Sequence, residues 1–129
     1  EPLAELERVR KAMVSGGRVI IEVPHAMDAL LSIYDLDAFR AFTLWSEHLV
    51  LHTRDSLTKY LQAAGFQNVR VTGIQRYPLA NHLYWLRHGK PGGQEVWKEL
   101  RDTGSELSYA SMLGKLGRSD TLIAEGFAA

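Results

Sequence analysis

The stretch GGRVIIEVPHAMDAL, residues 16–30, constrains the fold more than any other part of the sequence. Two glycines precede a continuous apolar and β-branched run that stops at Pro24. A strand with one wet face alternates apolar and polar residues, whereas a continuous run is typical of a strand covered on both faces, as in a parallel sheet. We therefore expect residues 18–23 to form a buried strand, with His25 just beyond its carboxyl end.

Composition places the chain among ordinary globular proteins. Its 129 residues, 46% of them hydrophobic, suffice for one domain with its own core. Fifteen basic and fifteen acidic residues cancel, which argues against nucleic acid or a membrane surface as partner. No cysteine is present, so disulfides and thiolate chemistry are excluded, and a reducing compartment, the cytoplasm, is expected. No apolar run approaches the roughly 20 residues of a membrane span.

Periodicity and capping signals give the expected elements. Helices are expected over residues 2–14, 37–52, 54–64, 81–88, 94–102 and 105–116. Strands are expected over residues 18–23, 68–76 and 121–127. The clearest helix is 54–64, where Thr53 is a suitable N-cap and Gly65 a suitable C-terminal residue. This order belongs to the α/β class. Residues 1–129 are expected to form one domain, with 78–118 as a helical insertion or cap.

The expected sheet is incomplete. A strand buried on both faces needs a neighbour along each edge, and the chain easily supplies only one for residues 18–23. An exposed strand edge offers unpaired backbone groups to another chain. We therefore expect association at this edge, either as a homo-oligomer or with another segment.

The order of these elements resembles the second half of a class I S-adenosylmethionine-dependent methyltransferase. The resemblance rests on a helix, GG, a strand ending in EVP, a capped helix ending in AGF, a strand, an insertion and a final strand. It implies a truncated Rossmann-like methyltransferase fold made of the family's last three strands, the C-terminal one antiparallel and lying in the middle. The family's cofactor is S-adenosylmethionine, and its glycine-rich turn and acidic ligand belong to the half that does not correspond to this sequence. Gly16 and Gly17 do not replace that turn, because they precede a strand instead of following one.

Residues 22–66 are similar to a subgroup that includes sugar C-methyltransferases, in which a Glu-His pair precedes a capped helix. The resemblance implies that His48 is the catalytic base beside a sugar ketone and that Glu47 holds the histidine or the substrate. Imidazole suits this role because it titrates near neutral pH. Trp45 stands where such families often have a tyrosine. The alternative is that the pair only flanks a helix in solvent. His48 and His52 have zinc-binding spacing, but the sequence indicates no third ligand, so no metal is expected.

Candidate substrate-binding residues follow the first two expected strands. His25 comes directly after the first strand, where open α/β sheets bind ligands, and Tyr34 could reach the same cleft. The second strand is followed by polar and aromatic side chains. These candidates are Arg76, Tyr77, Asn81 and His82. Polar groups among aromatic rings suit a sugar or another small polar metabolite.

Simpler roles stay open for several of these residues. Asn81 could be a helix N-cap, and Asp28 suits a local turn or helix position. The segment Lys90–Gly93 could form a phosphate-binding corner, but a plain loop is the stronger interpretation.

Together these features predict the substrate-binding half of a methyltransferase that acts on a small polar metabolite and is inactive by itself. The alternative is a non-catalytic, self-associating methyltransferase-like binding module.

Overall fold

The computed structural model describes residues 2–44 and 51–129. Its strands are β1 (Arg18–Pro24), β2 (Phe66–Ile74) and β3 (Thr121–Ala128). Its helices are α1 (Pro2–Ala12), α2 (Ala29–Ser32), α3 (Asp37–Thr43), α4 (Arg54–Ala63), α5 (Leu79–His88), α6 (Gly93–Val96), the 3-10 helix η1 (Lys98–Leu100) and α7 (Thr103–Leu116). The α/β class expected from the sequence is confirmed.

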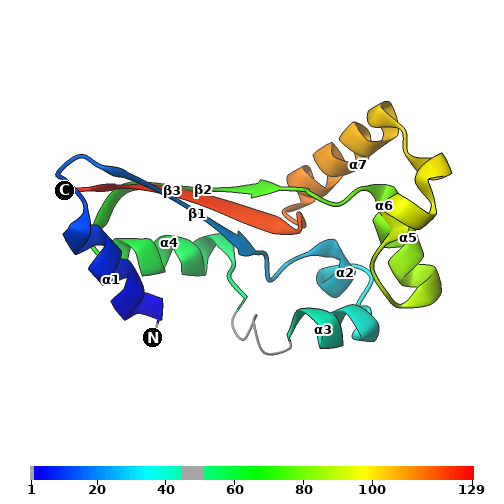
Figure 1. Cartoon of the computed structure of the whole chain (residues 1–129), viewed down its shortest axis with the longest axis horizontal. Coiled ribbons are helices and arrows are strands. Elements are labelled where there is room, and N and C mark those ends of the chain that lie inside the picture. The colour runs from blue at the N-terminus through cyan, green and yellow to red at the C-terminus, as the bar shows by residue number, and fades with distance from the viewer. Residues whose placement is uncertain (1, 45–50) are drawn as a thin grey trace.

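The three strands form one sheet in the order β1-β3-β2. Because β3 is antiparallel to both neighbours, β1 and β2 run parallel to each other. The expectation that the last strand lies in the middle is confirmed. Pro24 and Ile74 both pair with Thr121, so the carboxyl ends of β1 and β2 meet the start of β3 at one end of the sheet. Helices α5, α6 and α7, which connect β2 to β3, gather beyond that end (Figure 1).

One face of the sheet carries the main core, covered by α1 and α4 (Figure 1). Leu57 and Leu61 of α4 are almost fully buried against Leu122 of β3. Helix α4 starts where sequence analysis places it, because the Thr53 hydroxyl accepts the Ser56 N–H and the Ser56 hydroxyl accepts the Thr53 N–H. These caps fix the start of the helix that contributes Leu57 and Leu61 to the core.

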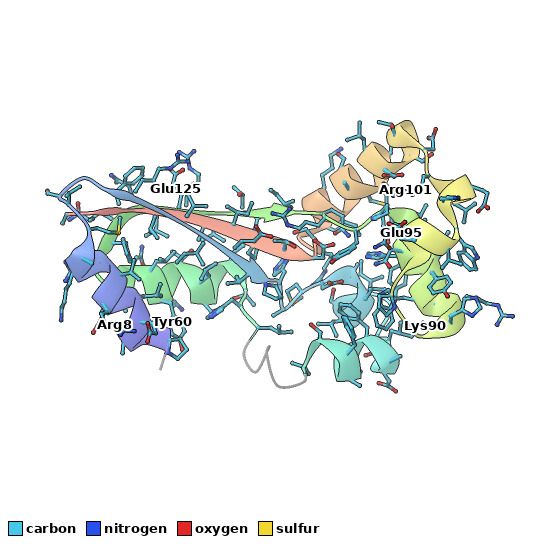
Figure 2. The ribbon with its side chains drawn as sticks, in the orientation of Figure 1. Arg8, Tyr60, Lys90, Glu95, Arg101 and Glu125 are labelled. Atoms are coloured by element: carbon cyan, nitrogen blue, oxygen red, sulfur yellow. The ribbon has the colours of Figure 1, made fainter. Side chains whose placement is uncertain are left out.

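The expectation that β1 is covered on both faces is wrong for this chain. Val19, Ile21 and Val23 pack toward the core, but Ile20 is 57% exposed. Among the described residues no helix layer covers the opposite face, which carries an Arg18–Glu125 ion pair at 2.6 Å. Figure 2 shows Glu125 on the side of the sheet away from α1 and α4. Strand β1 also lies at the sheet edge, since β3 occupies the position between β1 and β2.

Two helical expectations also change. The helix expected over 37–52 is α3, which ends at Thr43, and residues 45–50 lie outside the described residues. The helix expected over 94–102 is two short pieces, α6 and η1. In the parts of the chain that the structure describes, no helix combines the length and apolar character required to cross a bilayer.

Candidate functional site

A cavity of about 690 Å³ opens where the strand ends meet α2, α3 and α5. Its lining combines acidic, imidazole, amide and aromatic side chains. The side chains that line it include Glu22, His25, Asp28, Phe39, Phe42, Arg76, Tyr77, Asn81, His82, Trp85, Gln94 and Asp120. Five of the six candidate substrate-binding residues border this cavity, and the sixth, Tyr34, lies behind it.

Asp120, just before β3, fixes the rear of the cavity. Its carboxylate accepts the backbone N–H groups of Arg76 and Tyr77 at 2.9 and 3.0 Å. It also accepts the Gln75 side-chain amide and the Thr121 hydroxyl, each at 2.9 Å. Burial raises the pKa of Asp120, while these hydrogen bonds oppose that rise. The loop after β2 is therefore fastened to the start of β3, a link that sequence reasoning did not find.

His82 is held in a buried polar chain. Its Nδ1 lies 2.6 Å from the Tyr109 hydroxyl, which lies 2.7 Å from the Tyr34 hydroxyl. Burial lowers the pKa of His82 to about 4, so the ring is neutral at physiological pH. The chain joins α5 and α7 to the residues after α2. Tyr34 thus contributes by supporting His82, and Tyr109, which burial keeps protonated through a raised pKa, was not found from the sequence.

His25 lies at the carboxyl end of β1 and is 4% exposed. Its Nδ1 is 2.8 Å from the Ser119 carbonyl oxygen, so Nδ1 donates and Nε2 keeps its lone pair. Burial is the main reason that the pKa of His25 is lowered. A neutral imidazole with a free acceptor nitrogen therefore borders the cavity.

Asp28 has the local role that the sequence suggested. It is the N-cap of α2, and its Oδ1 accepts the Leu30 N–H at 2.8 Å. It is also 5% exposed and borders the cavity. Burial penalises its ionised form and raises its pKa to about 7. The sequence indicated the cap but not this titratable group inside the cavity.

Arg76, Tyr77 and Asn81 line the mouth and side of the cavity. Arg76 forms an ion pair with Glu22 of β1 at 2.5 Å, and Tyr77 is half-exposed. Asn81 is not an N-cap, because α5 begins after Pro78. Its Oδ1 accepts the Gly92 N–H at 3.2 Å instead. Asn81 therefore holds the segment that follows α5.

Aromatic rings form the remaining wall. Trp85 of α5 is 2% exposed and meets Phe39 and Phe42 of α3 edge-on, with centroids 5.0 and 5.1 Å apart. Such T-shaped contacts are favourable because the positive edge of one ring faces the negative face of another. These rings connect α3 to α5 across the cavity.

The segment Lys90–Gly93 does not form a phosphate-binding corner. Lys90 is exposed, and Figure 2 shows its side chain extending away from the body of the protein. The Gly92 amide is used by Asn81, as described above. Gly93 is buried so tightly against Ala80 of α5 that a Cβ atom would lie 2.2 Å from the Ala80 carbonyl oxygen. This segment packs against α5.

The two candidate catalytic residues, Glu47 and His48, lie outside the described residues, as does Trp45. His52 is described, and its Nδ1 lies 3.0 Å from the Ser56 hydroxyl at the start of α4. Within residues 2–44 and 51–129, no group of three or more side chains has the geometry of a metal site.

The described residues do not fit S-adenosylmethionine. The Gly16 N–H donates to the Ala128 carbonyl, and the Gly17 carbonyl accepts the Ala128 N–H. Ala128 ends β3, whereas the cavity lies where β3 begins. The glycine pair therefore closes the opposite end of the sheet, and it opens a strand where a cofactor turn would open a helix.

Comparison with known proteins gives little sequence evidence. No family model and no curated protein matches the chain. Among solved structures, the chain is similar to phosphoethanolamine N-methyltransferase 2 of Haemonchus contortus, determined with phosphomonomethylethanolamine and S-adenosylhomocysteine. The TM-score is 0.43 and the identity 12%, over 95% of this chain. The match spans 28% of that protein's length, and the chain is not placed in its family.

Proposed function

We propose that this chain is the acceptor-binding part of an S-adenosylmethionine-dependent methyltransferase that acts on a small polar metabolite, such as a sugar. The observation that carries the proposal is the sheet order β1-β3-β2, with antiparallel β3 between two parallel strands. This is the arrangement implied for the last three strands of the family. The cavity supports the same proposal, because it lies at the carboxyl ends of β1 and β2.

The cofactor would be held by a separate segment that continues the sheet at β1. Among the described residues, β1 pairs with β3 alone, so its other edge can accept a further strand. Ile20 stands exposed on the uncovered face beside that edge. A segment with its own strands and helices would cover the edge and the face together, and would complete the wall of the cavity near His25.

The chemistry assigned to this chain is to orient the acceptor and to take its proton. Aligning an acceptor with its reaction partner removes much of the entropic barrier to a transfer reaction. His48 stays our proposed base, with Glu47 beside it, as the resemblance to sugar C-methyltransferases implies. His25 is a second neutral imidazole at the cavity and has a free acceptor nitrogen.

The rival function is a non-catalytic binding module that associates with itself. The free β1 edge and the uncovered sheet face favour it equally, since a second copy could occupy both. In that case the cavity would bind a ligand without transforming it.

Expression of the chain alone and joined to the coding sequence that precedes it in its genome tests the proposal. Titration of S-adenosylmethionine should give no binding to the chain alone. The longer product should bind the cofactor and transfer a labelled methyl group to a small acceptor. His48→Gln in the longer product should abolish most of the transfer while leaving cofactor binding intact. A longer product that binds no cofactor and behaves as a self-associated oligomer would favour the rival function.

A further inference from the structure

We infer that the cavity binds a small molecule that carries a protonated primary amine. This inference rests on the proposed function in one respect: it takes the cavity to be the acceptor site and names the class of acceptor. Three features of the cavity support it, namely its excess of negative charge, its unfilled hydrogen-bond acceptors and its aromatic wall.

The ionisable lining is acidic. Glu22, Asp28 and Asp120 face one guanidinium, that of Arg76. Arg76 is paired with Glu22 and also lies close enough to Asp120 to lower its pKa, so this one guanidinium is shared between two carboxylates, while the hydrogen-bond donors on Asp120 are backbone, amide and hydroxyl groups. Arg54 and Arg118 lie close enough to lower the pKa of His25, but neither lines the cavity. A cation would therefore be favoured in the cavity over an anion or a neutral molecule.

Three hydrogen-bonding positions on the cavity lining are acceptors with capacity left. Among the described residues, Oε1 of Gln94 is the buried side-chain polar atom without a hydrogen-bond partner, and Gln94 lines the cavity. Nε2 of His25 keeps its lone pair, as shown above. The Asp28 carboxylate accepts one hydrogen bond, from the Leu30 N–H, and when ionised can accept others. A primary ammonium has three donors and no acceptor, so it matches this set where a hydroxyl, with one donor, does not.

The aromatic wall suits the rest of such a ligand. Trp85, Phe39 and Phe42 give an apolar surface for a carbon skeleton, and the half-exposed Tyr77 stands at the opening. Aromatic rings also attract cations through their negative faces. The wall therefore adds to the preference for an amine and also accommodates the metabolite that bears it.

The test compares two probes of equal size on the whole 129-residue chain. Glucamine and sorbitol are linear polyols that differ in one position, where glucamine has an ammonium and sorbitol a hydroxyl. Calorimetric titration at about pH 8 keeps Asp28 mostly ionised, because its pKa is about 7. Charge-assisted hydrogen bonds contribute about 1.5–3 kcal/mol, so glucamine should bind about 10-fold to 100-fold more tightly than sorbitol.

Asp28→Asn is the decisive variant. Asparagine caps a helix as well as aspartate does, so α2 and the fold are retained while the charge is removed. The preference for glucamine should fall to threefold or less. Asp102→Asn, at the exposed N-cap of α7 and outside the cavity, is the matched control and should leave the preference unchanged. Gln94→Leu should weaken glucamine binding without affecting the urea midpoint of unfolding.

Three results would overturn the inference: sorbitol binding as well as glucamine, neither probe binding at millimolar concentration, or Asp28→Asn keeping the full preference. These results are separate from the fate of the methyltransferase proposal. If a longer gene product methylates only neutral acceptors, the amine inference is wrong and the methyltransferase proposal still stands. If the protein binds glucamine selectively but never transfers a methyl group, the amine inference still stands and the methyltransferase proposal is wrong.

Discussion

Removing the Asp120 carboxylate should destabilise the protein by about 3 kcal/mol. Asp120→Ala leaves four donors without their acceptor: the N–H groups of Arg76 and Tyr77, the Gln75 amide and the Thr121 hydroxyl. A hydrogen bond contributes about 1 kcal/mol net, and more when one partner is charged. The sum, about 4–6 kcal/mol, is reduced because the burial that raises the pKa of Asp120 shows that its charge is costly to bury.

Urea unfolding followed by tryptophan fluorescence measures this loss, with Asp102→Ala as the control. Asp102 is also an aspartate that accepts a backbone N–H, from Ser105, but it is exposed, so its removal should cost about 1 kcal/mol. Asp120→Asn should fall between the two, because an amide keeps one acceptor oxygen and turns the other into a donor. If Asp120→Ala costs no more than Asp102→Ala, the carboxylate does not hold the loop after β2, and our description of the rear of the cavity fails.

Three further predictions concern stability and association. Between about pH 4 and 7 the Asp28 carboxyl is protonated in the folded chain and ionised in the unfolded chain, so its contribution to stability falls as pH rises, by up to about 1.4 kcal/mol per pH unit. Asp28→Asn should therefore gain in urea midpoint relative to wild type across that range, and parallel profiles would contradict the raised pKa. Gly93→Ala should cost about 1–3 kcal/mol through its clash with Ala80, whereas Gly114→Ala, in open space on α7, should raise the thermal midpoint. Ile20→Lys should leave the unfolding free energy within about 0.5 kcal/mol, because Ile20 is exposed, and should abolish the self-association at β1 that the rival function proposes, as measured by analytical ultracentrifugation.

Local patterns in the sequence were enough to predict the three strands, helix α4 and the order of most elements. The cap at Thr53 and the glycine after α4 act within one turn of the helix, so neighbouring residues carry the whole signal. Strands β1 and β3 are marked by apolar runs bounded by Pro24 and by the turn before Thr121. The middle position of β3 came from the resemblance to a family, because pairing order is not written in any local pattern.

The cavity was predicted only in part, since its chemistry depends on distant pairs. Gln75 and Asp120 are 45 residues apart, and neither looks unusual in the sequence. The burial that makes Asp28 titrate near neutral pH comes from elements that lie far along the chain, and so does the link between His82 and Tyr109. His25 could be predicted because the end of its strand is visible in the local sequence, and α/β sheets bind ligands at the carboxyl ends of their strands.

The failed expectation for β1 bears on both the proposed function and its rival. The burial of β1 alternates along the strand, and its exposed positions hold two charged residues, Arg18 and Glu22, with Ile20 between them. At 57% exposure, Ile20 forgoes roughly half of the about 1.5–3 kcal/mol that full burial of an isoleucine provides. A covering segment would recover this free energy and pair the open edge in the same step. The exposed isoleucine therefore favours a covering partner, which a separate cofactor-binding segment would supply under the proposed function and a second copy of this chain under the rival function.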